Sequence, residues 1–255
     1  DAAFIQAAQD LDDFAVTPYN GGTSGHKLFR MNHVVDTSKK IMENLNDMII
    51  ACRGFIPYSG GVYSLRIDQP SASVLNIGAD QIISGIAIAG TRKEDRFNQV
   101  KVNFFNAGAE YKEDQAIYPE QNSELYQQYL AEDEGEPLVD EVDLFSVNNY
   151  YSAREMARLF LERSRQNMTI AFQGTSELIN LEVGEVVSIT HPTPAWENKL
   201  FQVQEVSLVF DGTVQITCIE YDAALYTYDT PEQEQPFVGT RLPDPTIVDA
   251  VTSLT

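Results

Sequence analysis

Apolar and polar side chains alternate in four short runs between residues 168 and 218, and this alternation constrains the fold most. Alternation with a period of two is typical of strands that bury one face. Asp211-Gly212 separates the last two runs and predicts a tight hairpin turn. Within the third run the parity of the apolar positions switches, which predicts a β-bulge near Gln204–Glu205. Hairpin-linked strands of this kind indicate an antiparallel sheet.

A helix and further strands precede these four runs. Four isoleucines between residues 82 and 88 predict one strand, and Val100, Val102 and Phe104 alternate in a second. Ser152-Ala153-Arg154-Glu155 is a capping box that predicts a helix over 152–166. We expect its buried face to hold Ala153, Met156, Phe160 and Leu161, and its solvent side to hold Arg154, Arg158, Glu162, Arg163 and Arg165. The predicted fold is α+β and mainly antiparallel β, a barrel or sandwich over 76–228 with a flanking helix.

The first 75 residues predict a small α+β unit. Helical spacing of apolar residues predicts one helix over 1–16, and Asp36-Thr37-Ser38 offers caps for a second helix. Gly54 stands where the second helix needs a left-handed C-terminal residue. A hairpin then follows, in which Ser59-Gly60-Gly61 turns between residues 55–58 and 62–67.

Two segments show no regular pattern. Residues 106–149 are predicted to be irregular and include the acidic run Glu132–Glu136, and long loops of this kind are usually functional, mobile or in contact with a partner. Residues 229–255 are a Pro-rich linker in composition. Because the chain starts at Asp1 and ends in this linker, we expect it to be a segment of a longer protein.

Charge excludes two classes of partner. The chain of 255 residues holds 38 Asp and Glu against 17 Lys and Arg, a formal net charge of −21. A sequence-independent nucleic-acid binder needs cations to replace phosphate counterions, and binding to an anionic membrane surface also requires cations. The excess of negative charge therefore excludes both partners. No apolar run of the roughly 20 residues that span a bilayer is present, and no signal peptide opens the sequence. Cys52 and Cys218 are expected to be two buried thiols in a reducing compartment.

No motif predicts catalysis. The stretch Gly22–Leu28 lacks the hydroxyl and the Gly-Lys step of a phosphate loop, and a turn is the better interpretation. His26, His33 and His191 have no second His or Cys at metal-binding spacing, and no Gly-x-Ser-x-Gly elbow accompanies them. We therefore predict no catalytic, cofactor-binding or metal-binding residue, no cofactor and no enzymatic activity.

Two other function classes remain open from the residues alone. A cell-wall hydrolase would use acids such as Glu182, Glu185 or Asp211. A carbohydrate- or receptor-binding module would use a stacking surface formed by Trp196, Tyr221, Tyr226 and Tyr228. For Trp196, an aromatic ring that covers one end of the barrel is an equally good interpretation.

The order of segments resembles the tail-tip attachment protein (protein J) family of long-tailed bacteriophages. The most specific stretch is LEVGEVVSITHPTPAW at residues 181–196. The similarity continues through most of the chain to about Tyr226, in the segments Asn32–Ser38, Cys52–Phe55, Tyr58–Tyr63, Gly85–Ile88, Arg96–Val102, Ala153–Arg165, Phe201–Val203 and Glu220–Asp222.

This resemblance implies a structural role. Such proteins resemble the central hub of a tail tip, related in fold to the baseplate hub of contractile phages, with tail-tube-like barrel domains in a homotrimeric ring. The implied partners are tail-tube or distal tail proteins and the tape measure protein, with indirect contact to a host receptor. DNA would pass without specific binding, and no membrane insertion of this segment is expected. The implied location is the virion tail tip, assembled in the bacterial host cytoplasm. A hub of a contractile apparatus or a gene-transfer particle is a related interpretation.

Overall fold

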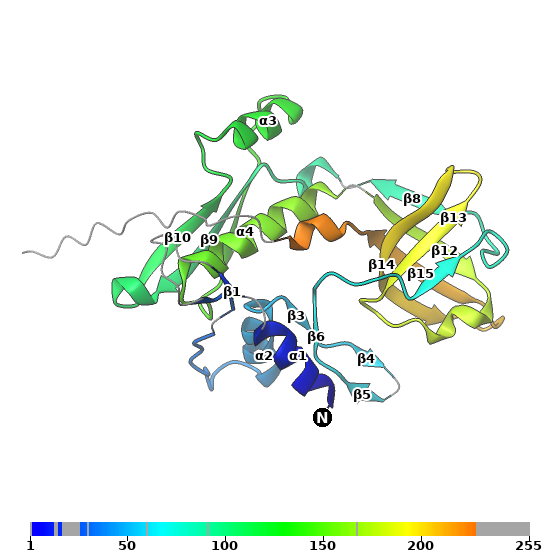
Figure 1. Ribbon diagram of the computed structural model, residues 1–255, viewed down its shortest axis with the longest axis horizontal. Coiled ribbons are helices and arrows are strands. Elements are labelled where there is room, and N and C mark those ends of the chain that lie inside the picture. Colours follow the sequence, from blue (N-terminus) through cyan, green and yellow to red (C-terminus); the bar gives the residue numbers. More distant parts are fainter. Residues whose placement is uncertain are drawn as a thin grey trace, which may run out of the picture.

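The computed structural model describes residues 2–12, 15–16, 26–29, 31–59, 61–90, 92–166 and 168–227 (Figure 1). The predicted linker over 229–255, Tyr228 and the loop over 17–25 lie outside these residues. Figure 1 shows a large sheet on the right, a small sheet on the left beside helix α4, and the N-terminal elements below α4.

The larger sheet has six strands in the order β7-β13-β14-β15-β12-β8. All neighbours are antiparallel except the parallel pair β7 and β13. Five of the six strands send side chains into one buried cluster, so the sheet curls around its own core. Among the described strands it is open between β7 and β8 and does not close into a barrel. The strands are β7 (Leu75–Ile77), β8 (Ala87–Gly90), β12 (Met168–Gly174), β13 (Val186–His191), β14 (Trp196–Leu208) and β15 (Val214–Glu220).

Two local predictions for this sheet are confirmed. The register between β14 and β15 shifts between Val203 and Glu205, at the predicted bulge. In the hairpin turn, Gly212 has a φ of 83°, which glycine adopts without steric cost. The Asp211 carboxylate accepts hydrogen bonds from the backbone N–H and the hydroxyl of Thr213 and closes the turn.

The smaller sheet has three strands and is covered by α4. Its central strand pairs antiparallel with β10 and parallel with β11. Val100, Val102 and Phe104 point inward and are fully buried against the helix residues Ala153 and Leu161. The elements are β9 (Gln99–Asn106), β10 (Lys112–Tyr118), α3 (Glu124–Glu132), β11 (Val139–Asp143) and α4 (Tyr150–Arg165), with the 3₁₀ turns η1 (Lys93–Asp95) and η2 (Ala107–Ala109).

The N-terminal part combines two helices with short strand pairs. Strand β3 pairs with β6, and β4 pairs with β5, which confirms the predicted hairpin. The elements are α1 (Ala2–Asp12), β1 (Ala15–Val16), β2 (His26–Lys27), α2 (Ile41–Ile50), β3 (Gly54–Phe55), β4 (Tyr58–Ser59), β5 (Val62–Tyr63) and β6 (Arg66–Ile67). Two further 3₁₀ turns, η3 (Ser176–Asn180) and η4 (Ala223–Tyr226), belong to the part after α4.

The predicted ends of α2 are wrong in detail. Its N-cap is Lys40, whereas Asp36 forms a turn with Ser38 four residues earlier. Arg53, not Gly54, takes the left-handed conformation, with a φ of 58°. Gly54 is needed for a different reason, because a Cβ there would lie 2.7 Å from the Ile49 side chain.

The segment 106–149 is regular, contrary to prediction. It contains β10, α3 and β11, whose polar exposed faces carry little apolar periodicity. The predicted capping box of α4 is also wrong. Asn149 caps the helix by accepting a hydrogen bond from Ser152 N, while the Ser152 hydroxyl is buried and donates to the Leu28 carbonyl.

The predicted class, α+β with mainly antiparallel sheets, is confirmed. The predicted buried face of α4 is confirmed as well, since Ala153, Met156 and Leu161 are at most 1% exposed. Within the described residues, no helix has the length and apolar character required to cross a bilayer.

Candidate functional site

The two histidines whose side chains are described lie in separate structural contacts. His33 Nδ1 is 2.8 Å from Ser146 Oγ, and its Nε2 is 3.3 Å from Asn44 Oδ1. His191 Nδ1 accepts a hydrogen bond from Thr193 N at 3.3 Å, within the turn before β14. In the described part of the chain, no three His, Cys, Asp or Glu side chains are grouped closely enough to hold a metal ion.

The three acids weighed for hydrolysis are engaged in local structure. Glu182 forms an ion pair with Arg66, and Glu185 accepts a hydrogen bond from Glu182 N at 2.9 Å. The hydrogen bonds from Thr213 lower the pKa of Asp211 in the β14–β15 turn. A glycosidase needs one carboxyl with a raised pKa that faces a second, ionised carboxylate, whereas the pKa of Asp211 is lowered.

The acidic run after α3 is an ion-pair cluster. Asp133 is buried, and its Oδ2 is 2.9 Å from Arg165 Nη1 while its Oδ1 is 3.2 Å from Arg96 Nε. Glu136 lies 2.9 Å from Lys93 Nζ. These contacts attach the end of α3 to the end of α4 through the buried Asp133, while the side chains of Glu132, Glu134 and Glu136 remain exposed at the surface.

The aromatic residues proposed for a stacking surface are mostly buried. The ring of Trp196 lies 5.1 Å from that of Phe201 and is packed against the core of the six-stranded sheet. Tyr221 and Tyr226 are 6% and 4% exposed. A sugar-binding platform requires open ring faces, so Tyr221 and Tyr226 do not form the predicted stacking surface, while Trp196 is partly buried.

Helix α4 joins three units of the structure, namely the N-terminal part, the three-stranded sheet and the six-stranded sheet. The place where they meet is called the α4 junction below. One face packs on the three-stranded sheet, while Leu159 packs with Val186, Tyr221 and Tyr226 on the other side. The predicted solvent side of α4 is therefore partly covered, and Arg158, Glu162, Arg163 and Arg165 on it form ion pairs. The side chains of Arg158 and Glu162 are only 12% and 21% exposed.

A buried ion-pair chain runs along this second face of α4. Arg158 donates two hydrogen bonds to the Glu155 carboxylate, at 2.6 and 2.9 Å, and one to Glu162 at 2.8 Å. It also donates to the Leu225 carbonyl at 2.7 Å. Arg53, which ends α2, places Nη1 3.9 Å from Glu155 Oε1, and both side chains are almost fully buried. The chain of charges thus links α2, α4 and the end of the six-stranded sheet.

Asp68 forms a second centre at the same junction. It is 5% exposed and forms an ion pair with Arg163 of α4. Its Oδ1 accepts a hydrogen bond from the Tyr226 hydroxyl at 2.7 Å and one from Gln202 Nε2 of β14 at 3.3 Å. One carboxylate therefore holds the N-terminal unit against both α4 and the larger sheet.

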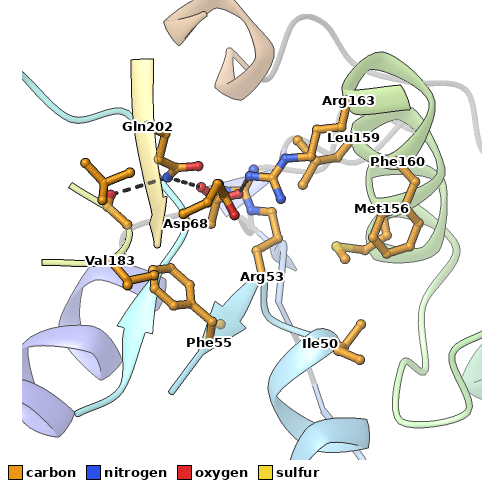
Figure 2. A pocket seen from close by; sticks show the side chains of 14 residues that line it. Ile50, Arg53, Phe55, Asp68, Met156, Leu159, Phe160, Arg163, Val183 and Gln202 are labelled. Atoms are coloured by element: carbon orange, nitrogen blue, oxygen red, sulfur yellow. Dashed lines mark hydrogen bonds and ion pairs between the residues drawn. The ribbon is translucent and has the colours of Figure 1, made fainter. Parts of the chain in front are cut away.

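A cavity of about 310 Å³ lies beside these charges. Figure 2 shows Arg53 and Asp68 pointing toward one another, with Gln202 and Arg163 beside them and an apolar lining around them. The apolar lining comes from α2, β3, α4 and the segment before β13, and includes Ile50, Phe55, Met156, Leu159, Phe160 and Val183.

The electrostatics of the junction favour fixed ion pairs. Burial lowers the pKa of Arg53, partly offset by Glu155. Burial would also lower the pKa of Arg158, but its hydrogen bonds to Glu155 and the charge of Glu162 outweigh it and raise that pKa. Burial raises the pKa of Glu162 and of the Tyr226 hydroxyl. Matched pairs of this kind fix geometry, since each charge already has its partner.

The sequence prediction missed Arg53, Asp68 and Gln202, which lie far from α4 in the chain. One signal was available, because four of the 17 cations fall within residues 154–165. In a chain of charge −21, so many arginines on one helix indicate carboxylate partners nearby.

Comparison with known proteins places these residues in a family. A family model described as "Putative phage tail protein" matches residues 40–206. Baseplate hub protein pb3 of Escherichia phage T5 is 23% identical over 199 residues, which cover 78% of this chain and 20% of pb3. The chain thus spans a fifth of the length of this curated relative.

Two solved structures share the fold. A chain of the virion of a native gene transfer agent particle superposes with a TM-score of 0.58 at 14% identity, over 75% of this chain and 42% of that one. A tail protein from Neisseria meningitidis MC58 superposes with a TM-score of 0.54 at 12% identity, over 88% of this chain and 67% of that one.

Proposed function

This chain belongs to the phage tail protein family whose model matches residues 40–206, and from this we propose that it is the hub segment of a tail tip. The hub would connect the tail tube to the host-recognition apparatus and would act without catalysis. Residues 1–75 and 76–228 would be its two folded parts, followed by a linker to a further module. The resemblance of residues 181–196 to tail-tip attachment proteins supports the tip position over a position along the tube.

The observation that carries this proposal is the α4 junction. A hub transmits force between the parts attached to it, so its own units must not slide over one another. Here α4 is buried on two sides, and Asp68 and Glu155 connect three units through hydrogen-bonded charges. Removing one partner of such a buried pair leaves an uncompensated charge and costs about 3–5 kcal/mol, so each charge depends on the arrangement of the units that supply its partners.

The proposed partners follow from the same role. The hub would be a homotrimer that contacts tail-tube or distal tail proteins and the tape measure protein, with only indirect contact to a receptor. It would be part of the virion and would assemble in the host cytoplasm. The relative from phage T5 is named a baseplate hub protein, which supports a hub role, and the individual partners follow from the resemblance to tail-tip attachment proteins.

The negative charge supports passage of DNA through the hub without binding. Carboxylates near a channel repel phosphate, and a net charge of −21 leaves few cations to hold it. Electrophoretic mobility of DNA mixed with the full-length protein tests this. No retardation is expected at 50 mM salt, and tight retardation that weakens as salt is added would contradict a non-binding channel.

Electron microscopy of labelled particles tests the function itself. A gold-labelled tag on the full-length protein should appear at the tail tip, and particles from a deletion strain should lack tips. Label along the tube, or normal tips without the protein, would refute the hub role. A peptidoglycan-release assay separates the hydrolase alternative, because a hub should release no more product than buffer.

A further inference from the structure

The second half of β14 is an open edge. Strand β13 pairs with β14 only as far as Gln202. The backbone of Val203 then forms hydrogen bonds with Gly184 and Glu185. From Gln204 onward, the described chain pairs β14 only with β15. Val209 N donates to Thr213 O across the turn, so alternate residues direct their backbone groups to the open side.

This open edge carries large apolar side chains. Leu208 is 65% exposed, and Phe210 next to the turn is fully exposed. Residues 206–210 contain no charge, although Glu205 and Asp211 flank them. The bulge between Val203 and Glu205 lies before residues 206–210, so it does not protect them, and an uncharged apolar edge invites another strand. The β14 edge is therefore a place for strand addition.

Strand β8 is a second open edge at the far end of the same sheet (Figure 1). It pairs with β12 on one side, and all four of its residues are exposed. Its side chains are small apart from Ile88, which is 51% exposed, and residues 81–90 are uncharged.

These two edges suit one another between two copies of the chain. Copies that each carry a charge of −21 repel, so they can approach closely only through uncharged surface. If β8 pairs with β14, Ile88 lies beside large apolar side chains of β14, and apolar cross-strand pairs of this kind stabilise a sheet. Two β8 edges would bury little apolar surface.

We propose that β8 of one copy adds as a strand to the open edge of β14 in the next copy. The contact is heterologous, so repeated copies form a ring where the rotation between them closes and a filament where it does not, and a hub at the end of a tail requires the closed ring. This inference rests on the proposed hub function only in requiring several copies in one tail tip.

Cysteine pairing in mixed particles tests the contact. Ile88→Cys and Leu208→Cys are introduced separately into the full-length protein in a Cys52→Ser background, and particles are assembled from one variant or from both. Oxidation should yield cross-linked dimers only from the mixture. Dimers from either single variant would overturn the heterologous contact, and so would a mixture that assembles into tips without cross-links.

Lysine substitutions supply a second measurement. Leu208→Lys and Ile88→Lys should each abolish ring formation, because a charge on the open edge blocks strand addition. Val34→Lys is the matched control. Val34 is 89% exposed beside a different cavity of about 730 Å³, which also includes Phe105 and Phe145. Loss of rings in Val34→Lys alone would move the interface to that cavity and refute the edge contact. Gold labelling of the tail tip tests the hub role separately, so failure of the edge contact can be distinguished from failure of the hub role.

Discussion

Replacing Glu155 by glutamine removes the central charge of the α4 junction and keeps the shape of the side chain. The Glu155 carboxylate is 2% exposed, accepts two hydrogen bonds from Arg158 and lies 3.9 Å from Arg53 Nη1. After the substitution, two buried guanidinium groups face a neutral amide. An uncompensated buried charge is the costly result, more than the loss of the pair itself.

The loss of stability in Glu155→Gln depends on which partners remain for Arg158 and Arg53. Arg158 retains Glu162 at 2.8 Å and the Leu225 carbonyl at 2.7 Å, so its charge stays partly balanced. Arg53 is 1% exposed at its side chain and cannot turn to solvent without opening the cavity. Breaking a buried pair costs about 3–5 kcal/mol, and the partners left to Arg158 place Glu155→Gln near 3 kcal/mol.

Urea unfolding at pH 7 measures this loss, with Glu162→Gln as the matched control. Glu162 is more exposed than Glu155, 21% against 2%, and its replacement leaves Arg158 paired with Glu155, so it should cost less, about 1–2 kcal/mol. A smaller shift in midpoint for Glu155→Gln than for Glu162→Gln would refute the reasoning. The slope of the unfolding line should stay unchanged in both variants, because neither alters the surface exposed on unfolding.

The Glu162→Gln variant also tests how stability depends on pH. Burial raises the pKa of Glu162 in the folded chain, against the opposing charge of Arg158. The folded chain therefore binds this proton more readily, and stability rises as pH falls through the raised pKa toward the usual value. Glutamine has no such proton to bind. Between the raised and the usual pKa of Glu162, the free energy of unfolding of the wild type should therefore increase relative to that of Glu162→Gln as the pH falls. A difference that stays flat would contradict burial as the dominant cause.

Three further predictions test other parts of the fold. Gly184→Ala should cost more stability in urea unfolding than Gly61→Ala, because Gly184 has a φ of 91° and a Cβ would lie 2.3 Å from the tip of the Phe55 ring, which would have to shift. Gly61→Ala, with a φ of 83° and open space, should cost only about 1–2 kcal/mol. Burial raises the pKa of Cys218 to about 12, so its thiol should react with a thiol reagent at pH 8 only at the rate of unfolding. Asn149→Ala should cost about 1 kcal/mol of stability in urea, as the loss of an N-cap.

Strands with one buried face could be predicted because their sequence period matches their geometry. Val100, Val102 and Phe104 alternate with polar residues, and each is fully buried. The bulge after Val203 could be predicted for the same reason, since an inserted residue shifts the parity of the pattern. Where burial alone decides the structure, the pattern of apolar residues was sufficient.

Segments stabilised by polar contacts could not be predicted in this way. Strand β10 is mostly polar, and its Asp114 accepts a hydrogen bond from Asn106 across the hairpin. Helix α3 is attached through Asp133 to Arg165 and Arg96, from other parts of the chain. Polar side chains of this kind resemble loop residues until their partners are known.

The α4 junction was invisible for a related reason. Asp68 and Arg163 are 95 residues apart in sequence, and Asp68 and Tyr226 are 158 apart. Helical periodicity places Arg158 and Arg163 away from the three-stranded sheet, as predicted, but it does not reveal that a second layer covers that side. The covering layer depends on tertiary packing, which no local pattern encodes.

The distribution of ion pairs bears on how copies of this chain can meet. At least nine of the 17 lysines and arginines have a carboxylate partner within the chain, many of them at the α4 junction and at the end of α3. Few cations are therefore left to attract a neighbouring copy, while the excess of 21 negative charges repels it. An interface formed by the uncharged edges β8 and β14 should then strengthen as salt screens this repulsion. An interface made of salt bridges would weaken instead, so the salt dependence of ring formation, followed by sedimentation of the full-length protein, separates the two.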